Sequence, residues 1–318
     1  MGELPSREEL EAAHCWEDGD HVPRWPAATA FRRLQRYHQA RWREAAGHPI
    51  GTQPIVPRDS GPARPVGSRV PLDYARDTGA SFLTPAALDA VRSRSSVTEP
   101  HQSRDAQRTW ADLLWAPSLA YNLFGDLAAD VRLADRALRA WWPDVPGSVA
   151  EVRFEHSPGW LDPAFLGNLI SFDAAFVLDL GDGTQGVVGI DVTYHEPLKA
   201  LQPKPQRLPR YEEVARRSGL FRRDTIEHAE RTDLLLLWLG HLLALSMVQH
   251  PSDTWRWCRF VVVRSAGRID VADACERYRR QLVADEPTFD AVTLEDLLGA
   301  GALPRRLATA LRARYVPD

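Results

Sequence analysis

The stretch "GVVGIDVTYHEP", Gly186 to Pro197, begins as an apolar strand and ends in polar residues. Side chains two residues apart in an extended strand share a face. Asp191, Thr193 and His195 are therefore expected to project together, while the residues between them point the opposite way. An acid near the end of a buried strand marks a candidate site, and its partner should lie on a neighbouring strand.

That partner is predicted on the preceding strand, "ISFDAAFVLDL" from Ile170 to Leu180. The linking residues "GDGTQ" contain an Asp-Gly pair, which is a hairpin signal. Asp173 lies near the start of its strand and Asp191 near the end of the next, so antiparallel pairing brings them to one end of the sheet. An earlier strand, "SVAEVRFE", ends at Glu155.

Helices are predicted on both sides of these strands. Apolar residues recur at helical spacing from about residue 105 to 142, with Pro117 and Gly125 as candidate breaks, and again from Ile226 to His250. The stretch "WCRFVVVR" then indicates another strand, and helices are expected near 271–284 and 293–314. The core order is helix, strand, strand, strand, helix, strand, which predicts an α/β fold with a mixed sheet flanked by helices.

The N-terminal part of the chain has a different pattern. Residues 29–46 predict a helix with an approximate apolar stripe and arginines elsewhere. Residues 47–70 are rich in proline, glycine and arginine and predict a loop or extended arm. We therefore expect a helical and extended arm over residues 1–104, packed on a core domain formed by residues 105–318.

Composition restricts the class of protein. With 318 residues, 44% of them hydrophobic, the chain can bury a large core, and its net charge of -4 argues against coating nucleic acid by charge alone. Three cysteines, at positions 15, 258 and 275, fit neither a zinc cluster nor a disulfide framework, so a reducing, cytoplasmic location is expected. The apolar run Leu234 to Val248 is too short to span a membrane and predicts a core helix.

Two carboxylates held close together repel one another unless a cation lies between them. Paired oxygen ligands suit Mg²⁺, or Mn²⁺ in its place, which binds one or two carboxylates together with waters and phosphate oxygens. Such an ion can polarise a phosphoryl oxygen, and Glu155 could orient the attacking water or complete the site. The alternative is that these strand-end acids are simply solvated.

The pattern of strand, Asp, strand, then acid-x-Lys resembles the PD-(D/E)XK restriction-endonuclease-like superfamily, and in particular a bacterial branch of predicted restriction endonucleases. The likeness extends over most of the chain. The stretches that carry it are "LQRYHQARWREAAGHPIG", "LLWAPSLAYNLFGDL", "VRFEHSPG", "SFDAAF", "GIDVTYHEP", "HLLALSM" and "RFVVV".

The resemblance implies a Mg²⁺-dependent endonuclease that hydrolyses DNA phosphodiester bonds. It implies that Asp173, Asp191 and the backbone carbonyl of Val192 hold the metal, with Glu155 as a further acid of the site. Asn122, in "YNLFG", would lie on a helix that borders the active site. DNA is the implied partner, and a homodimer is compatible with the family because restriction enzymes often act as dimers.

One position departs from the family motif, since Thr193 occupies the place of the lysine. A hydroxyl cannot supply the positive charge that stabilises the reacting phosphate, and losing such a group costs about two to three orders of magnitude in rate. His195 or Lys199 could supply the missing function. Alternatively, the chain is a catalytically inactive nucleic-acid-binding or assembly subunit of a defence or mobile-element system, or a metal-independent protein-interaction module.

Two further features have competing interpretations. A basic stretch could contact phosphates or form a solvated helix face; its arginines are Arg207, Arg210, Arg216, Arg217, Arg222 and Arg223. His241 lies in a leucine-rich helix, where a hydrogen-bonded core histidine is expected.

Overall fold

A five-stranded mixed sheet forms the centre of the computed structural model, which describes residues 4–15, 30–53, 64–97, 105–196, 204–222, 234–283 and 287–317. The sheet order is β3-β4-β5-β6-β7. The first three strands pair antiparallel and the last three pair parallel. Their bounds are β3 Ser148–His156, β4 Phe172–Asp179, β5 Gln185–Thr193, β6 Trp255–Arg264 and β7 Phe289–Thr293.

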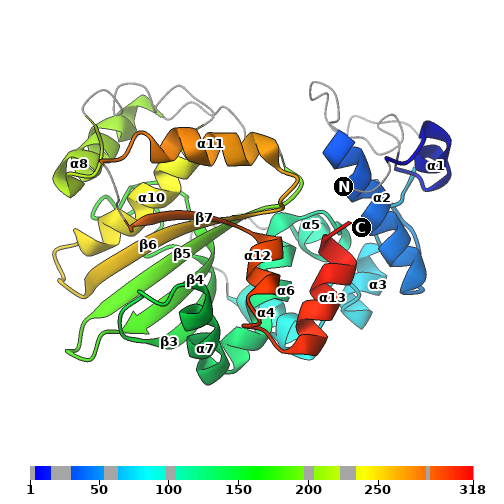
Figure 1. The fold of residues 1–318 in the computed structure, drawn as a ribbon, viewed down its shortest axis with the longest axis horizontal. Helices are drawn as coiled ribbons and strands as arrows, with labels where there is room; N and C mark the ends of the chain where they lie inside the picture. The colour runs from blue at the N-terminus through cyan, green and yellow to red at the C-terminus, as the bar shows by residue number, and fades with distance from the viewer. Residues whose placement is uncertain are drawn as a thin grey trace.

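Helices cover both faces of this sheet, which confirms the predicted α/β class (Figure 1). One apolar cluster joins the sheet to α4, α6, α7, α12 and α13. The other joins it to α8, α10 and α11. Their bounds are α4 Pro85–Ser96, α6 Ala116–Ala129, α7 Val131–Trp141, α12 Leu294–Gly299, α13 Arg305–Tyr315, α8 Leu208–Ser218, α10 Leu235–Val248 and α11 Ile269–Arg279.

The hairpin that carries the two acids has the predicted form. Gly181 and Gly183 adopt φ values of 85° and 82°, which favour glycine, and Asp179 accepts a hydrogen bond from the Gly181 N–H. Ala174 pairs with Ile190 at the other end of the hairpin. The next facing positions in this register are Asp173 and Asp191, so the acids meet at one end of the sheet.

Two predictions about the other elements were wrong. Strand β7 was not predicted, and the single helix expected over 293–314 is two helices, α12 and α13, separated by Gly301 at φ 69° and Pro304. Gly125 does not interrupt α6; a Cβ there would lie 2.5 Å from the Ala87 Cα, so glycine permits close approach of α4. Pro117 lies in the first turn of α6, where its missing N–H costs nothing.

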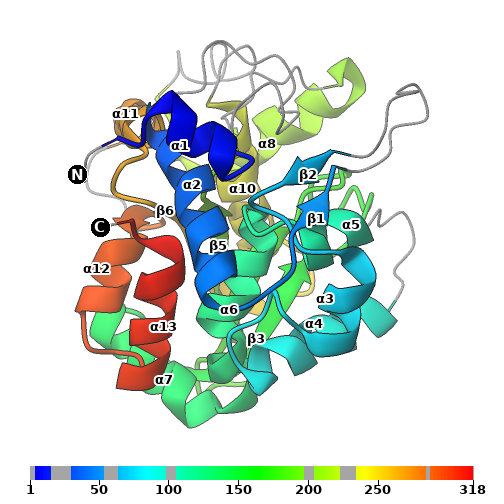
Figure 2. The same cartoon turned by 90° about the vertical axis from the view of Figure 1, so that its right-hand side faces the viewer.

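Helix α2 (Ala30–Ala45) buries a polar face rather than the apolar stripe expected from its sequence. Its buried residues are Arg32, Gln35, Arg36, Gln39, Ala40 and Arg43. Figure 2 shows α2 beside α13, against which it packs. Hydrogen bonds replace apolar contacts here: Gln39 Nε2 donates to the Arg314 carbonyl at 2.6 Å, and Arg43 Nε donates to the Gly67 carbonyl at 2.9 Å.

The remaining N-terminal elements pack beside the sheet rather than on its faces (Figures 1 and 2). They are α1 Arg7–Ala12, β1 Gly51–Thr52, β2 Pro65–Val66, α3 Leu72–Thr78 and α5 Ala106–Ala111. Val70, Ala75 and Val91 belong to the same apolar cluster as α6 and α7. The arm therefore shares a core with the residues after 105, while the boundary at residue 104 stays a prediction.

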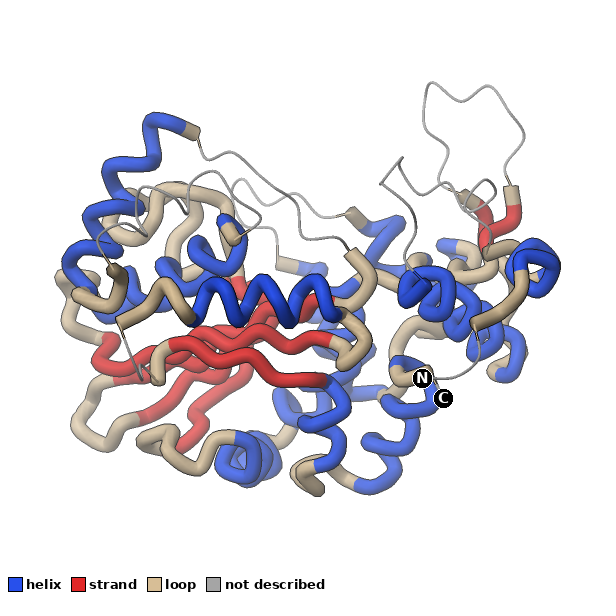
Figure 3. The backbone as a smooth tube through the Cα atoms, turned by 45° about the horizontal axis from the view of Figure 1, so that its top comes forward, coloured by secondary structure: helices blue, strands red, loops and turns tan. Residues whose placement is uncertain are grey.

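Helix α10 is buried along most of its length, as a core helix should be. Within the described segments, no helix is long and apolar enough to cross a membrane. All three cysteines are buried and outside any disulfide. The tube view shows α11 running alongside the strands at one edge of the sheet (Figure 3).

Candidate active site

The acids of β4 and β5 are joined by a direct contact at the end of the sheet. The backbone N–H of Val192 donates to Asp173 Oδ2 at 2.8 Å. Asp191 lies opposite Asp173, and its Oδ1 is buried with no hydrogen-bond partner among the described residues. A buried oxygen without a hydrogen-bond donor costs folding free energy. This pair of carboxyls is therefore suited to a ligand that supplies a positive charge or a hydrogen-bond donor.

The environment of the pair disfavours two negative charges. The pKa of Asp173 is raised to about 7: burial is the main cause, the hydrogen bond from the Val192 N–H opposes it, and the charges of Glu196 and Glu155 add to the rise. Burial also raises the pKa of Asp191 well above its ordinary value, with Asp173 as the next cause. The two carboxyls thus hold a proton near neutral pH unless a cation replaces it.

Glu155 occupies a strained position beside Asp173. Its φ of 45° places a non-glycine residue in the left-handed region. The Tyr121 hydroxyl donates to Glu155 Oε1 at 3.2 Å, and Arg94 donates to the Glu155 carbonyl at 3.2 Å. Strain of this kind persists where surrounding contacts enforce it, and it occurs often at functional sites.

Thr193 and His195 follow Asp191, but among the residues that the structure describes their side chains make no hydrogen bond to Asp173 or Asp191. The Thr193 hydroxyl donates to the Val263 carbonyl at 3.3 Å. Burial lowers the pKa of His195 well below its usual range, and the charges of Arg36 and Arg32 lower it further. His195 is therefore neutral at physiological pH and carries no positive charge.

Glu196 is an acid of this region that sequence reasoning did not assign to the site. Its Oε1 accepts from the N–H of Ala116 at 3.1 Å, at the first residue of α6, and its Oε2 accepts from the N–H of His195 at 3.3 Å. Its charge is one of those that raise the pKa of Asp173. No local signal in the sequence links Glu196 to a helix 80 residues earlier.

Asn122 makes structural contacts. It is fully buried, and its side-chain amide donates to the carbonyls of Ser81 and Ser118 and to the Tyr315 hydroxyl, at 3.0, 3.0 and 2.7 Å. Its Oδ1 accepts from the N–H of Leu83 at 2.6 Å. These bonds tie α6 to the segment before α4 and to α13, so a catalytic role for Asn122 stays a prediction. Lys199 lies outside the described residues.

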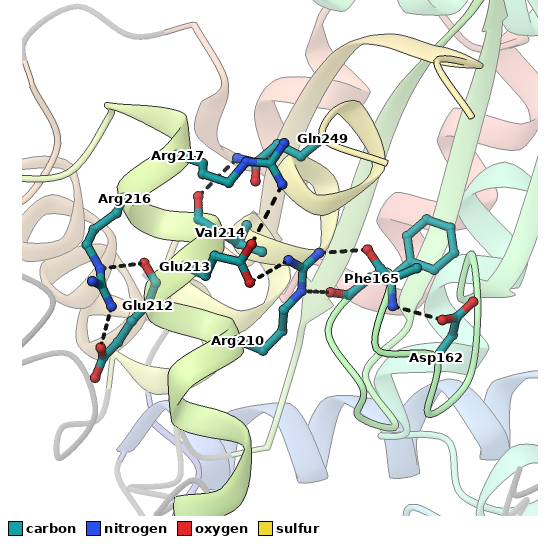
Figure 4. A network of polar contacts seen from close by, with 10 residues as sticks. Asp162, Phe165, Arg210, Glu212, Glu213, Val214, Arg216, Arg217 and Gln249 are labelled. Carbon is teal, nitrogen blue, oxygen red and sulfur yellow. Dashed lines mark hydrogen bonds and ion pairs between the residues drawn. The ribbon is translucent and has the colours of Figure 1, made fainter. Parts of the chain in front are cut away.

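Most of the basic stretch lies on α8, where its arginines form ion pairs with glutamates of the same helix (Figure 4). Arg210 pairs with Glu213 at 2.9 Å, and Arg216 pairs with Glu212 at 2.7 Å. Pairs of this kind are typical of a solvated surface. Arg207 and Arg222 flank this helix, while Arg223 lies outside the described residues.

His241 is a hydrogen-bonded core residue, as its sequence context predicted. Its Nδ1 lies 2.9 Å from the Tyr278 hydroxyl and its Nε2 lies 3.0 Å from Thr288 Oγ1. Burial lowers the pKa of His241 to about 3, so the ring is neutral.

The donor set fits a hard divalent cation with few protein ligands. Mg²⁺ takes one or two carboxylates and fills its other positions with water and phosphate oxygens. Asp173 and Asp191 supply two such groups, including the unsatisfied Oδ1 of Asp191. No cluster of three or more His, Cys, Asp or Glu suited to a metal occurs in the described part of the chain. Coordination by Glu155 as well therefore stays a prediction.

Comparison with known protein families gave a match over most of the chain. The model of the PD-(D/E)XK nuclease superfamily matches residues 26–317. Neither the search of curated proteins nor that of solved structures gave a significant match.

Proposed function

Since the chain belongs to the PD-(D/E)XK nuclease superfamily, we propose that it is a Mg²⁺-dependent endonuclease that hydrolyses DNA phosphodiester bonds. The observation that carries the proposal is the pairing of Asp173 and Asp191 at one end of the sheet, where both carboxyls have raised pKa values. Two half-buried acids that share a site without a cation destabilise the protein, and a metal-binding role would explain why the chain carries them.

Asp173 and Asp191 would hold the ion, together with the backbone carbonyl of Val192. The N–H of Val192 points toward Asp173, and the N–H and C=O of one strand residue point toward the same neighbouring strand. When bound, Mg²⁺ supplies polarisation of a phosphate oxygen. Glu155, whose Oε1 accepts a hydrogen bond from the Tyr121 hydroxyl, would accept a hydrogen bond from the attacking water.

A specific observation favours the second candidate, an inactive nucleic-acid-binding or assembly subunit of a defence or mobile-element system. The motif lysine is absent, and the side-chain hydroxyl of Thr193 donates its proton to the Val263 carbonyl. The neutral state of His195 removes it as a source of positive charge. This candidate predicts DNA binding with steep salt dependence and no turnover.

The experiment that separates the two candidates is a cleavage assay on supercoiled plasmid and a random-sequence duplex library, with Mg²⁺ or Mn²⁺. The endonuclease proposal predicts metal-dependent nicking or cutting that Asp191→Asn abolishes. The matched control is Asp179→Asn, which changes an exposed acid at the other end of β4 and should cleave normally. Cleavage that survives Asp191→Asn would refute the assigned site. DNA binding without cleavage would favour the second candidate.

A further inference from the structure

Strand β6, which pairs with β5, has an arginine directly opposite the position where the motif lysine is missing. Strands β5 and β6 pair in parallel, with Asp191 facing Val262 and Thr193 facing Arg264. Neighbouring strands lie about 4.8 Å apart, and side chains in register point to the same face of a sheet. The side chain of Arg264 therefore begins one strand away from residue 193, where the side chain of the motif lysine would begin.

Arg264 and the two acids share one face of the sheet. In β6, Phe260 and Val262 belong to the cluster under α10 and α11, while Val261 and Val263 belong to the other cluster. Alternation then places Arg264 on the α10 side. In β5, Val187 belongs to that same cluster, and alternation places Asp191 and Thr193 there too.

The charge of Arg264 acts on that side of the sheet as well. Burial raises the pKa of Cys275, on α11, to about 11, and the charge of Arg264 is the first influence that opposes the rise. This independent observation agrees with the alternation along β6.

The side chain of Arg264 is incompletely satisfied. Its Nε is buried and has no hydrogen-bond partner in the part of the chain that the structure describes. Its Nη1 donates to the carbonyls of Ser265 and Ala266 at 3.2 and 3.4 Å, at the long end of the hydrogen-bond range. A partly buried guanidinium with long bonds to backbone oxygens retains donors for an anion.

Another arginine near this sheet end is already occupied. Arg268 is buried and binds both oxygens of Asp270, at 2.8 and 3.0 Å, and the Tyr194 carbonyl at 3.1 Å. Moving it to a phosphate would break all three contacts. Within the described ranges, Arg264 has no comparable bidentate partner, because its hydrogen bonds go to two backbone carbonyls.

We propose that Arg264 supplies the positive charge that the motif lysine provides elsewhere in the superfamily, by contacting the phosphate at the site of hydrolysis. The inference rests on the proposed function. During hydrolysis, the water oxygen forms a bond to phosphorus and loses a proton to solvent, and a phosphorus–oxygen ester bond breaks, so that the leaving oxygen takes a proton from solvent and departs as a hydroxyl. Arg264 keeps its proton throughout, because a guanidinium does not deprotonate in proteins. Its contribution is electrostatic, through hydrogen bonds to phosphate oxygens that gain charge.

The test compares Arg264→Met, Arg264→Lys and the control Arg256→Met. Arg256 lies on the same strand near its other end and has a side chain that is 54% exposed. Cleavage of plasmid with Mg²⁺ should fall by about two to three orders of magnitude in Arg264→Met and remain unchanged in the control. Adding Thr193→Lys to Arg264→Met should recover at least about tenfold of the lost rate, because it returns a cation to the motif position.

A second readout does not depend on turnover. Binding of a duplex oligonucleotide in Ca²⁺ is measured at several salt concentrations. Affinity falls as salt rises, and each phosphate contact contributes about −0.9 to the slope of log K against log salt. Arg264→Met should make that slope less negative by about one, Arg264→Lys should leave it unchanged, and the control should match the wild type.

The outcomes separate this inference from the proposed function. Wild-type cleavage with unchanged rate and salt slope in Arg264→Met would overturn the role of Arg264 and leave the endonuclease proposal standing. No wild-type cleavage, with a reduced slope in Arg264→Met, would refute the endonuclease proposal and support the phosphate contact. A loss of cleavage in Arg264→Met with an unchanged slope would overturn the contact, because the defect would then be structural.

Discussion

Replacing Asp173 by asparagine should stabilise the metal-free protein at alkaline pH. The carboxyl has a folded-state pKa of about 7 against an ordinary value of 3.8, so the folded state resists its ionisation. Asparagine is never charged, and its Oδ1 can still accept the hydrogen bond from the Val192 N–H. Asp173→Asn thus removes the cost of burying a negative charge and retains the hydrogen bond from the Val192 N–H.

The size and sign of the stability difference between Asp173→Asn and the wild type follow from proton linkage. Between pH 3.8 and about 7, the unfolded carboxyl is ionised while the folded one is protonated, so stability falls by about 1.4 kcal/mol for each pH unit. Below this window the group contributes nothing to the pH dependence, and above it the loss is complete. From pH 5 to pH 8 the wild type should lose roughly 2.7 kcal/mol relative to Asp173→Asn.

Water that reaches the partly exposed carboxyl reduces this figure, and we expect about 1.5 to 2.5 kcal/mol. A chain of this size shifts its Tm by about 2 °C per kcal/mol, so the relative change is about 3 to 5 °C. Thermal melts in EDTA at pH 5 and pH 8 measure it. Asp179→Asn, an exposed acid of the same strand, should show no such change between the two pH values.

Divalent ions at pH 8 should make the wild type more stable than Asp173→Asn. Millimolar Mg²⁺ or Mn²⁺ should raise the Tm of the wild type, because binding to the folded state alone is stabilising, and should leave Asp173→Asn unchanged. An Asp173→Asn protein that is less stable than the wild type in EDTA at pH 8 would refute the reasoning. So would a stability difference that does not vary with pH.

Three further substitutions test the packing around the site by denaturant unfolding. Gly189→Ala should cost about 1 to 3 kcal/mol, because its Cβ would lie 2.5 Å from the buried Phe172 ring; an unchanged midpoint would contradict this close approach. Asn122→Ala should cost about 2 to 4 kcal/mol, since it leaves buried partners on three segments without hydrogen bonds, and a loss below 1 kcal/mol would argue against the crosslink. Tyr194→Phe should cost about 1 to 3 kcal/mol, because the buried amide of Gln39 loses its hydroxyl acceptor; a neutral effect would show that the contact is dispensable.

Local patterns in the sequence were sufficient for the hairpin and for the meeting of its acids. A period of two separates the faces of a strand, and an Asp-Gly turn sets the register, so Asp173 and Asp191 could be brought together without tertiary information. The mixed α/β sheet followed from the order of helical and strand patterns. The short strand β7 has only five residues and little alternation, which is why it was not predicted.

Only the tertiary structure decided which groups surround those acids. Glu196 reaches the first residue of α6, and Arg264 lies beside Thr193, through contacts between segments about 70 to 80 residues apart in the chain. The buried face of α2 is polar because Tyr194 and the end of α13 offer it hydrogen bonds, which its own residues cannot reveal. The sequence determined each strand and its alternating faces because those depend on near neighbours. The pairing of distant strands and helices determined the electrostatic environment, because charges act through space rather than along the chain.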